Sequence, residues 1–217
     1  MVNFRIRYSK TGLIRFTSHI DTMRIFSRAF YRSGLPIYFT EGFNPHPYIT
    51  LGLPLSLGFE SLCDICDFRL TEERSPEEIL AKLQPVLPDG IHLMEAYTDP
   101  QPVKRISAAR YRTVAEGAFT AETLETARRF FQQDSLVTTK KSKKGEKELD
   151  VRPMIKDLSL SLEGTSLVLD SLLAAGSTDN LNPELLLKLL RDHFGLTVEA
   201  ALHTRTAILT DAGKPIR

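Results

Sequence analysis

The stretch from Phe4 to Pro36 reads FRIRYSKTGLIRFTSHIDTMRIFSRAFYRSGLP and decides how the chain begins to fold. Phe4, Ile6 and Tyr8 alternate with two arginines, which predicts a strand with one apolar face. We expect the extended chain to turn at residues 10–12 and to continue as a hairpin to residue 16.

The second part of this stretch predicts a helix. Ser18 is a suitable N-cap, apolar residues recur at every third or fourth position after it, and Gly34 and Pro36 end the pattern. A strand followed by an amphipathic helix is the first unit of an α+β fold.

The elements that follow complete a β-α-β-β-α-β order in the N-terminal half. We expect extended chain at Ile37–Phe39 and Tyr48–Leu53, a strand at Leu62–Leu70, a helix that begins at Ser75-Pro76 and a strand at Ile91–Tyr97. This order is typical of the ferredoxin-like fold, in which two helices cover one face of an antiparallel sheet.

The C-terminal half shows a similar order after a linker at residues 98–102. Its expected elements are a strand at 109–115, a helix at 121–132, a strand from 136 to 141 that resumes near 149–151, a strand at 166–173, a helix at 183–194 and a final strand at 197–209. The sequence therefore predicts an α+β protein of two ferredoxin-like (βαββαβ) domains, residues 1–100 and 101–217, each with an antiparallel sheet covered by two helices.

Composition and missing signatures limit the class of protein. The 217 residues are 42% hydrophobic and carry a net charge of +1, and we find neither an apolar run of membrane-spanning length nor a secretory signal. We expect a cytoplasmic protein that does not associate with membranes. Cys63 and Cys66 lie three apart on a strand and so point to opposite faces, which suits neither a disulfide nor a chelate. We expect no cofactor, and we find no complete catalytic signature.

A basic stripe is the first candidate for a binding site. Arg24, Arg28 and Arg32 follow one another at intervals of four, which places them on one side of the predicted helix. Guanidinium groups so arranged fit phosphates or carboxylates. The alternative is a solvated helix face paired with acids of a neighbouring element.

The loop Thr40–Pro47 is the second candidate. Two prolines bracket His46 and stiffen the chain, so Glu41, Asn44 and His46 could be held in place for binding, together with His19 and Asp21 at the start of the helix. The alternative is a structural turn whose polar groups cap nearby backbone.

Two further features lie in the C-terminal half. One is a lysine-rich turn that could contact phosphates without sequence preference or could simply be solvated: Lys140, Lys141, Lys143, Lys144 and Lys147. The other is Asp150-Val151-Arg152-Pro153, where Asp150 and Arg152 would share one face of a strand and form an internal ion pair.

Several of these motifs resemble a known family. They are IRFTSHID at residues 14–21 with Arg24 and Arg28-Ala29-Phe30, EGFNPHP at residues 41–47, Leu53-Pro54-Leu55 with Gly58 and Glu60-Ser61, and, more weakly, Asp150–Pro153. The chain resembles the bacterial radical SAM-associated family, a domain of unknown function found beside radical S-adenosylmethionine proteins or fused to them. The resemblance implies an accessory to a radical SAM protein. It also implies that genes for RNA metabolism and ribosomal proteins usually accompany the gene of this protein.

Three functions follow as expectations. The first is a non-catalytic recognition module that acts with a radical SAM enzyme and binds RNA or another anionic ligand through His19, Asp21, the three arginines, the loop residues and Arg152. The second is an RNA endonuclease that uses His19 and His46 as acid and base. The third is a protein–protein adaptor with an apolar patch around Phe43, Tyr48 and Leu51. The sequence does not indicate an oligomeric state.

Overall fold

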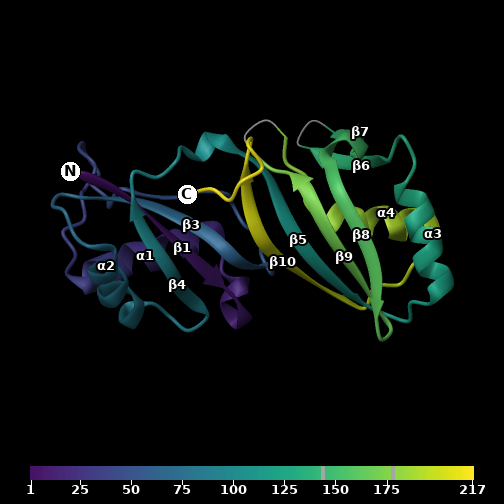
Figure 1. Cartoon of the computed structure of the whole chain (residues 1–217), viewed down its shortest axis with the longest axis horizontal. Helices are drawn as coiled ribbons and strands as arrows, with labels where there is room; N and C mark the ends of the chain where they lie inside the picture. Colours follow the sequence, from purple (N-terminus) through teal and green to yellow (C-terminus); the bar gives the residue numbers. More distant parts are fainter. Residues whose placement is uncertain (143–144, 177–178) are drawn as a thin grey trace. The chain divides into compact units, whose positions relative to one another are not determined.

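The computed structural model of the chain describes residues 1–142, 145–176 and 179–217. The chain divides into two compact units, which we call unit 1 (residues 1–105 with 215–217) and unit 2 (residues 106–214). Figure 1 labels most of their helices and strands. Each unit contains two of the four α-helices found in the described residues, together with antiparallel strands. The fold is therefore mixed α+β.

Unit 1 follows the order strand, helix, strand, strand, helix, strand. Its elements are β1 (Val2–Lys10), α1 (His19–Ser33), β2 (Ile49–Leu51), β3 (Glu60–Leu70), α2 (Pro76–Leu83) and β4 (Ile91–Thr98). β1 pairs with β4 on one side and β3 on the other, and β2 pairs with β3, always antiparallel. The short β2 is the strand that follows the Thr40–Pro47 loop.

The core of unit 1 lies between these strands and both helices. The Phe68 ring of β3 stacks on that of Phe4 at 5.6 Å between centroids and contacts Phe30 of α1 at 4.7 Å. Ile79 and Leu83 of α2 are buried in the same cluster. Both helices therefore cover one face of the strands, as Figure 1 shows.

Two expectations for unit 1 are wrong in detail. The chain does not turn back as a hairpin after Lys10, because a 3-10 helix occupies Gly12–Phe16. Its start is fixed by Thr11 N–H, which donates to the carbonyl of Gly90 at 2.9 Å, and by Gly12 N–H, which donates to Glu60 Oε1 at 2.8 Å. Residues 37–39 form only isolated bridges at Ile37 and Phe39.

Unit 2 contains more strands than expected. Its elements are β5 (Ile106–Glu116), α3 (Ala121–Phe131), β6 (Val137–Ser142), β7 (Gly145–Asp150), β8 (Ile155–Glu163), β9 (Ser166–Ala174), α4 (Glu184–Phe194) and β10 (Ala200–Thr210). The strand order is β10-β5-β9-β8, all antiparallel, and β6 pairs with β7 apart from these strands. The helices α3 and α4 lie beside one another, where the Phe130 ring contacts His193 and Phe194 (Figure 1).

The second strand expected in unit 2 does not pair with the other strands expected there. The strands β6 and β7 pair with each other, and β8, which we did not predict, pairs with β9 instead. Leu158, Leu160 and Leu162 do alternate with serines along β8. A two-residue turn with Gly164 at φ 61° joins β8 to β9, so that Glu163 pairs with Ser166. No helix in the described residues is long and apolar enough to cross a membrane.

Candidate functional site

The start of α1 is tied together by its own side chains. Ser18 Oγ accepts the backbone N–H of Asp21 at 3.1 Å and donates to Asp21 Oδ2 at 2.7 Å, while Arg24 Nη1 lies 3.1 Å from Asp21 Oδ1. These hydrogen bonds, first from Ser18 and then from Arg24, lower the pKa of Asp21. Arg24 therefore has an internal counterion, although this exposed pair is weak and salt-sensitive.

The other two arginines of the basic stripe have different environments. Arg32 Nη2 donates to the carbonyl of Val86 at 2.5 Å, so this side chain connects α1 to the 3-10 helix Gln84–Val86 that follows α2. Arg28 is exposed and forms no hydrogen bond or ion pair with any described residue. Of the three arginines, Arg28 thus lacks an internal partner among the described residues, Arg24 has a counterion and Arg32 is held by a backbone carbonyl.

The loop Thr40–Pro47 closes on itself. Thr40 N–H donates to the carbonyl of His46 at 2.9 Å, and His46 N–H donates to Thr40 Oγ1 at 3.2 Å. The Nδ1 atom of His46 lies 3.1 Å from both Thr40 Oγ1 and the carbonyl oxygen of Asn44. The side chains of Glu41 and Asn44 are exposed and form no hydrogen bond or ion pair with any described residue. These bonds are those of a structural turn, the alternative considered for the loop.

His19 faces a small cavity that does not include this loop. The cavity has a volume of about 10 Å³, enough for roughly one water molecule, and is lined by His19 with Lys10, Asp64 and the motif residues Leu53 and Leu55, among others. The structure therefore brings the first and third groups of motif residues together. His46 is not among the residues that line this cavity.

Lys10 and Asp64 were missed by the sequence analysis. They are 2% and 5% exposed, and Lys10 Nζ donates to the carbonyl of Thr17 at 2.8 Å. The sequence pattern does indicate that Lys10 is buried, because Lys10 continues the alternation of Ile6 and Tyr8 and therefore faces the core. Charged residues at inward positions of a strand are unusual enough to be noted as site candidates.

Arg152 of unit 2 is held by backbone groups. β7 ends at Asp150 and a 3-10 helix begins at Arg152, so the two residues do not share a strand face as expected. Asp150 Oδ1 accepts the N–H groups of Leu136 at 2.9 Å and Arg152 at 3.0 Å, and these two bonds lower the pKa of Asp150. The expected ion pair is thus mainly a backbone cap.

The Arg152 side chain reaches into a groove between α3 and β8. Its Nε donates to the carbonyl of Gln133 and its Nη1 to that of Ile155, both at 3.2 Å. The groove has a volume of about 510 Å³ and is lined by Arg128, Phe131, Gln132, Arg152 and residues 155–160. We call it the basic groove.

Three cations and one carboxylate line the basic groove. Arg128 Nη2 donates to the carbonyl of Leu160 at 2.8 Å, and its Nη1 pairs with Glu125 at 2.7 Å. Lys156 is exposed and has no partner among the described residues. The carboxylate is Asp157, whose Oδ2 lies 3.7 Å from Arg110 Nη1. The groove is concave and cationic, which suits an anionic ligand.

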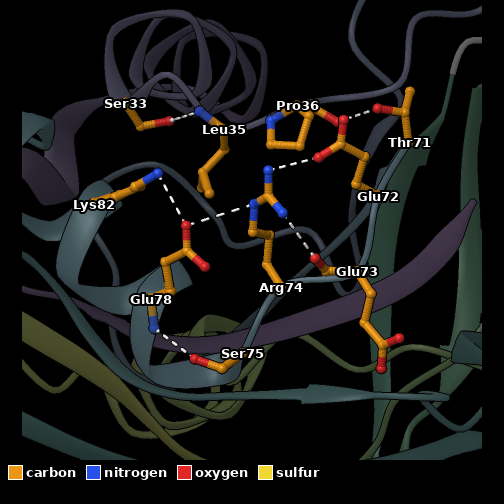
Figure 2. Close-up of polar contacts among 10 residues, drawn as sticks. All are labelled: Ser33, Leu35, Pro36, Thr71, Glu72, Glu73, Arg74, Ser75, Glu78 and Lys82. Atoms are coloured by element: carbon orange, nitrogen blue, oxygen red, sulfur yellow. Dashed lines mark hydrogen bonds and ion pairs between the residues drawn. The ribbon is translucent and has the colours of Figure 1, made fainter.

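A different arrangement surrounds Arg74, which lies beside α2. Figure 2 shows its guanidinium between two carboxylates, with Nη2 at 2.6 Å from Glu72 Oε2 and Nε at 3.5 Å from Glu78 Oε1. Lys82 Nζ also pairs with Glu78 at 2.9 Å. The two cations here are offset by two acids, so this cluster offers no site for an anion.

The remaining expected features are the adaptor patch, the two cysteines and the lysine-rich turn. Of the expected adaptor patch, Phe43 is fully exposed and Tyr48 is 38% exposed, but Leu51 is buried, so the apolar surface is not continuous there. Cys63 and Cys66 are buried and form no disulfide bond within the described part of the chain. Among the described residues no three His, Cys, Asp or Glu side chains are placed to hold a metal ion. The side chains of the lysine-rich turn at residues 140–147 lie outside the described residues.

Comparisons with known proteins identify a family and a similar fold. Residues 3–183 match the family DUF2344, described as an uncharacterized protein conserved in bacteria. None of the curated proteins compared with the chain matches it significantly.

Two solved structures show different degrees of similarity. A chain in the crystal structure of a Cbf5-Nop10-Gar1 complex aligns over 94% of this chain and 48% of its own, with a TM-score of 0.53 and 9% identity. This chain thus spans about half the length of that one, and the likeness concerns the fold alone. An unknown protein from Galdieria sulphuraria aligns over 94% and 98% of the two chains with 10% identity, but its TM-score of 0.28 supports no argument.

Proposed function

The chain belongs to the bacterial DUF2344 family, and from this premise we propose that it is a non-catalytic recognition module that binds RNA through the basic groove of unit 2. The observation that carries the proposal is the convergence of Arg128, Arg152 and Lys156 on one concave surface. From the sequence we expected Arg152 to take part in binding but expected the main site at the three arginines of α1 and the loop Glu41–Pro47.

The geometry of the groove supports a phosphate ligand. Arg128 and Arg152 each donate to backbone carbonyls, which fixes their guanidinium groups before a ligand arrives and reduces the entropy lost on binding. Planar guanidinium groups bind phosphate oxygens with defined geometry, and Lys156 adds a flexible charge. RNA presents such phosphates at regular intervals, so it can engage several cations at once.

Two further parts of the proposal concern the fold and the partner. We propose that each unit is a ferredoxin-like domain, an assignment supported by the strand orders β4-β1-β3-β2 and β10-β5-β9-β8 with antiparallel pairing.

The resemblance of the motifs at residues 14–21 and 41–47 to the radical SAM-associated family supports a cytoplasmic role beside a radical SAM enzyme. Co-expression with such an enzyme from the same bacterium, followed by tandem purification, tests the partner.

No observation favours the two other functions. His19 lines a cavity whose lining residues do not include His46, and His46 Nδ1 is engaged within its own loop. The expected adaptor surface is interrupted at Leu51.

Fluorescence anisotropy with a labelled single-stranded RNA tests the proposal. Lys156→Glu reverses one charge of the groove without breaking an internal bond, and Lys214→Glu makes the same change at an exposed position outside it. We expect the groove variant to bind at least several-fold more weakly than the control variant at equal salt concentration. Equal affinities for the two variants, or no binding by the wild type, would remove the proposed function.

A further inference from the structure

Unit 1 contains another cavity, of about 350 Å³, where β1 begins and β3 ends. Its polar and flat lining groups come from Asn3, Tyr48, Asp67, Arg69, Asp99 and Pro100. We call it the Arg69 pocket. Its volume lies within the range of small-ligand sites, which is about 300–1,000 Å³.

The guanidinium of Arg69 is held rigidly in this pocket. Its Nε donates to Asn3 Oδ1 at 2.8 Å, and its central carbon lies 4.5 Å from the ring centre of Tyr48 and 5.5 Å from that of Tyr38. The backbone fixes both rings, because Tyr48 N–H donates to the carbonyl of Tyr38 and Tyr38 N–H donates to that of Arg69, each at 2.8 Å. The Nη1 and Nη2 groups of Arg69 donate to none of the described residues. The pocket therefore contains an oriented guanidinium with free donors.

Asp99 supplies a free carboxylate to the same pocket. It is exposed and has no hydrogen-bond or ion-pair partner among the described residues. Its φ of 50° makes it the one described non-glycine residue in the left-handed region, a conformation that is often found at ligand sites. The other carboxylate, that of Asp67, is already neutralised by Arg5, which donates from Nε at 2.5 Å and from Nη2 at 2.7 Å. The pocket thus offers one free set of donors and one free acceptor group.

We propose that the Arg69 pocket binds a purine base, with guanine as the base that matches it best. Guanine carries two adjacent acceptors, O6 and N7, which suit the fork of an arginine. It also carries two adjacent N–H donors on its other edge, which suit the two oxygens of a carboxylate such as Asp99. The half-exposed ring of Tyr48 is a surface on which such a base can stack.

This inference goes beyond the proposed function, because it concerns a base in unit 1 rather than phosphates in unit 2. A simple phosphate fits the pocket less well, since it would meet the carboxylate of Asp99 as well as the cation. Nucleosides without phosphate are therefore the right probes, and their binding is independent of the basic groove.

Isothermal titration of the full chain with guanosine, inosine and cytidine tests the base. We expect guanosine to bind most tightly, inosine more weakly because it lacks the exocyclic amine, and cytidine most weakly. Equal binding of guanosine and cytidine, or no binding of guanosine, would overturn the proposal.

Substitutions then test the two polar groups. Asp99→Asn keeps a side chain that tolerates positive φ and removes the charge, and we expect about tenfold weaker guanosine binding. Arg69→Lys keeps the charge but loses the planar fork, so it should weaken binding too. Asp89→Asn, at an exposed position outside the pocket, is the matched control. Thermal unfolding of each variant confirms that it is folded, and wild-type affinity in a folded Asp99→Asn variant would refute the assignment.

Discussion

The carboxylate oxygen Oδ1 of Asp150 accepts the backbone N–H of Arg152 at 3.0 Å. The same oxygen accepts the N–H of Leu136, so it joins the two ends of the β6–β7 hairpin and fixes the turn from which Arg152 extends. A single acidic side chain thus positions a cation of the basic groove.

Asp150→Ala should weaken RNA binding although Asp150 is not among the groove-lining residues. Loss of the shared acceptor leaves the N–H groups of Leu136 and Arg152 without this partner and frees the turn that orients the guanidinium. We expect a several-fold loss of RNA affinity and a lower Tm, read by anisotropy and by circular dichroism. As the matched control, Asp134→Ala removes a nearby exposed acid of unit 2 that accepts no such hydrogen bond from the described residues. If the two variants bind RNA equally, the positioning role of Asp150 is wrong.

The lowered pKa of Asp150 predicts how stability changes with pH. Its backbone hydrogen bonds from Leu136 and Arg152 hold the pKa below the ordinary value of 3.8 in the folded state. The resulting stabilisation is present above the unfolded-state pKa and is lost as pH falls through the lower, folded-state value. Urea unfolding of the wild type and Asp150→Asn between pH 6 and pH 2 should show a difference that shrinks at the acid end. A constant difference would mean that the carboxylate charge is not involved.

Ser75→Ala should destabilise unit 1 by about 1 kcal/mol. Ser75 is the N-cap of α2, where its Oγ accepts the N–H of Glu78 at 3.1 Å, a bond drawn in Figure 2. Urea unfolding measures the loss. Ser159→Ala on the exposed side of β8 removes a hydroxyl that caps no helix and serves as the control. A variant as stable as the control would show that Pro76 alone defines the start of the helix.

Phe43→Ala should leave the free energy of unfolding unchanged, because the ring of Phe43 is fully exposed at the tip of its loop. The matched comparison is Phe30→Ala, which removes a fully buried ring of the unit 1 core and should cost about 3–5 kcal/mol. Chemical denaturation measures both. A large loss at Phe43 would place that ring in contact with other groups of the protein in solution.

The helices could be predicted from the sequence because their signals are local. Ser18, Ser75 and Thr120 each cap a helix by accepting an N–H three residues ahead, and Gly34 and Gly195 adopt the left-handed conformation at helix ends. Capping depends on neighbours in the sequence, so it can be recognised without tertiary information.

The strands and the sites depended on partners far away in the sequence. β8 is a strand because it pairs with β9. Residues 37–39 are not a full strand, because Ile37 bridges to Leu70 of β3 whereas Phe39 bridges to Pro47 of its own loop. The groove likewise joins Arg128 of α3 to Lys156 of β8, and the Arg69 pocket joins Asn3 to Asp99. The regular spacing of the three arginines along α1 did not reveal that Arg24 pairs with Asp21 and that Arg32 donates to the carbonyl of Val86.

The salt dependence of RNA binding tests the central claim most directly. For single-stranded RNA, the slope of log K against log salt concentration changes by about 0.7 for each phosphate contact. We predict that the double variant Arg152→Ala/Lys156→Ala has a shallower slope than the wild type by roughly twice that amount, while Lys104→Ala/Lys214→Ala keeps the wild-type slope. Identical slopes for all three proteins would contradict the assignment of RNA binding to the basic groove.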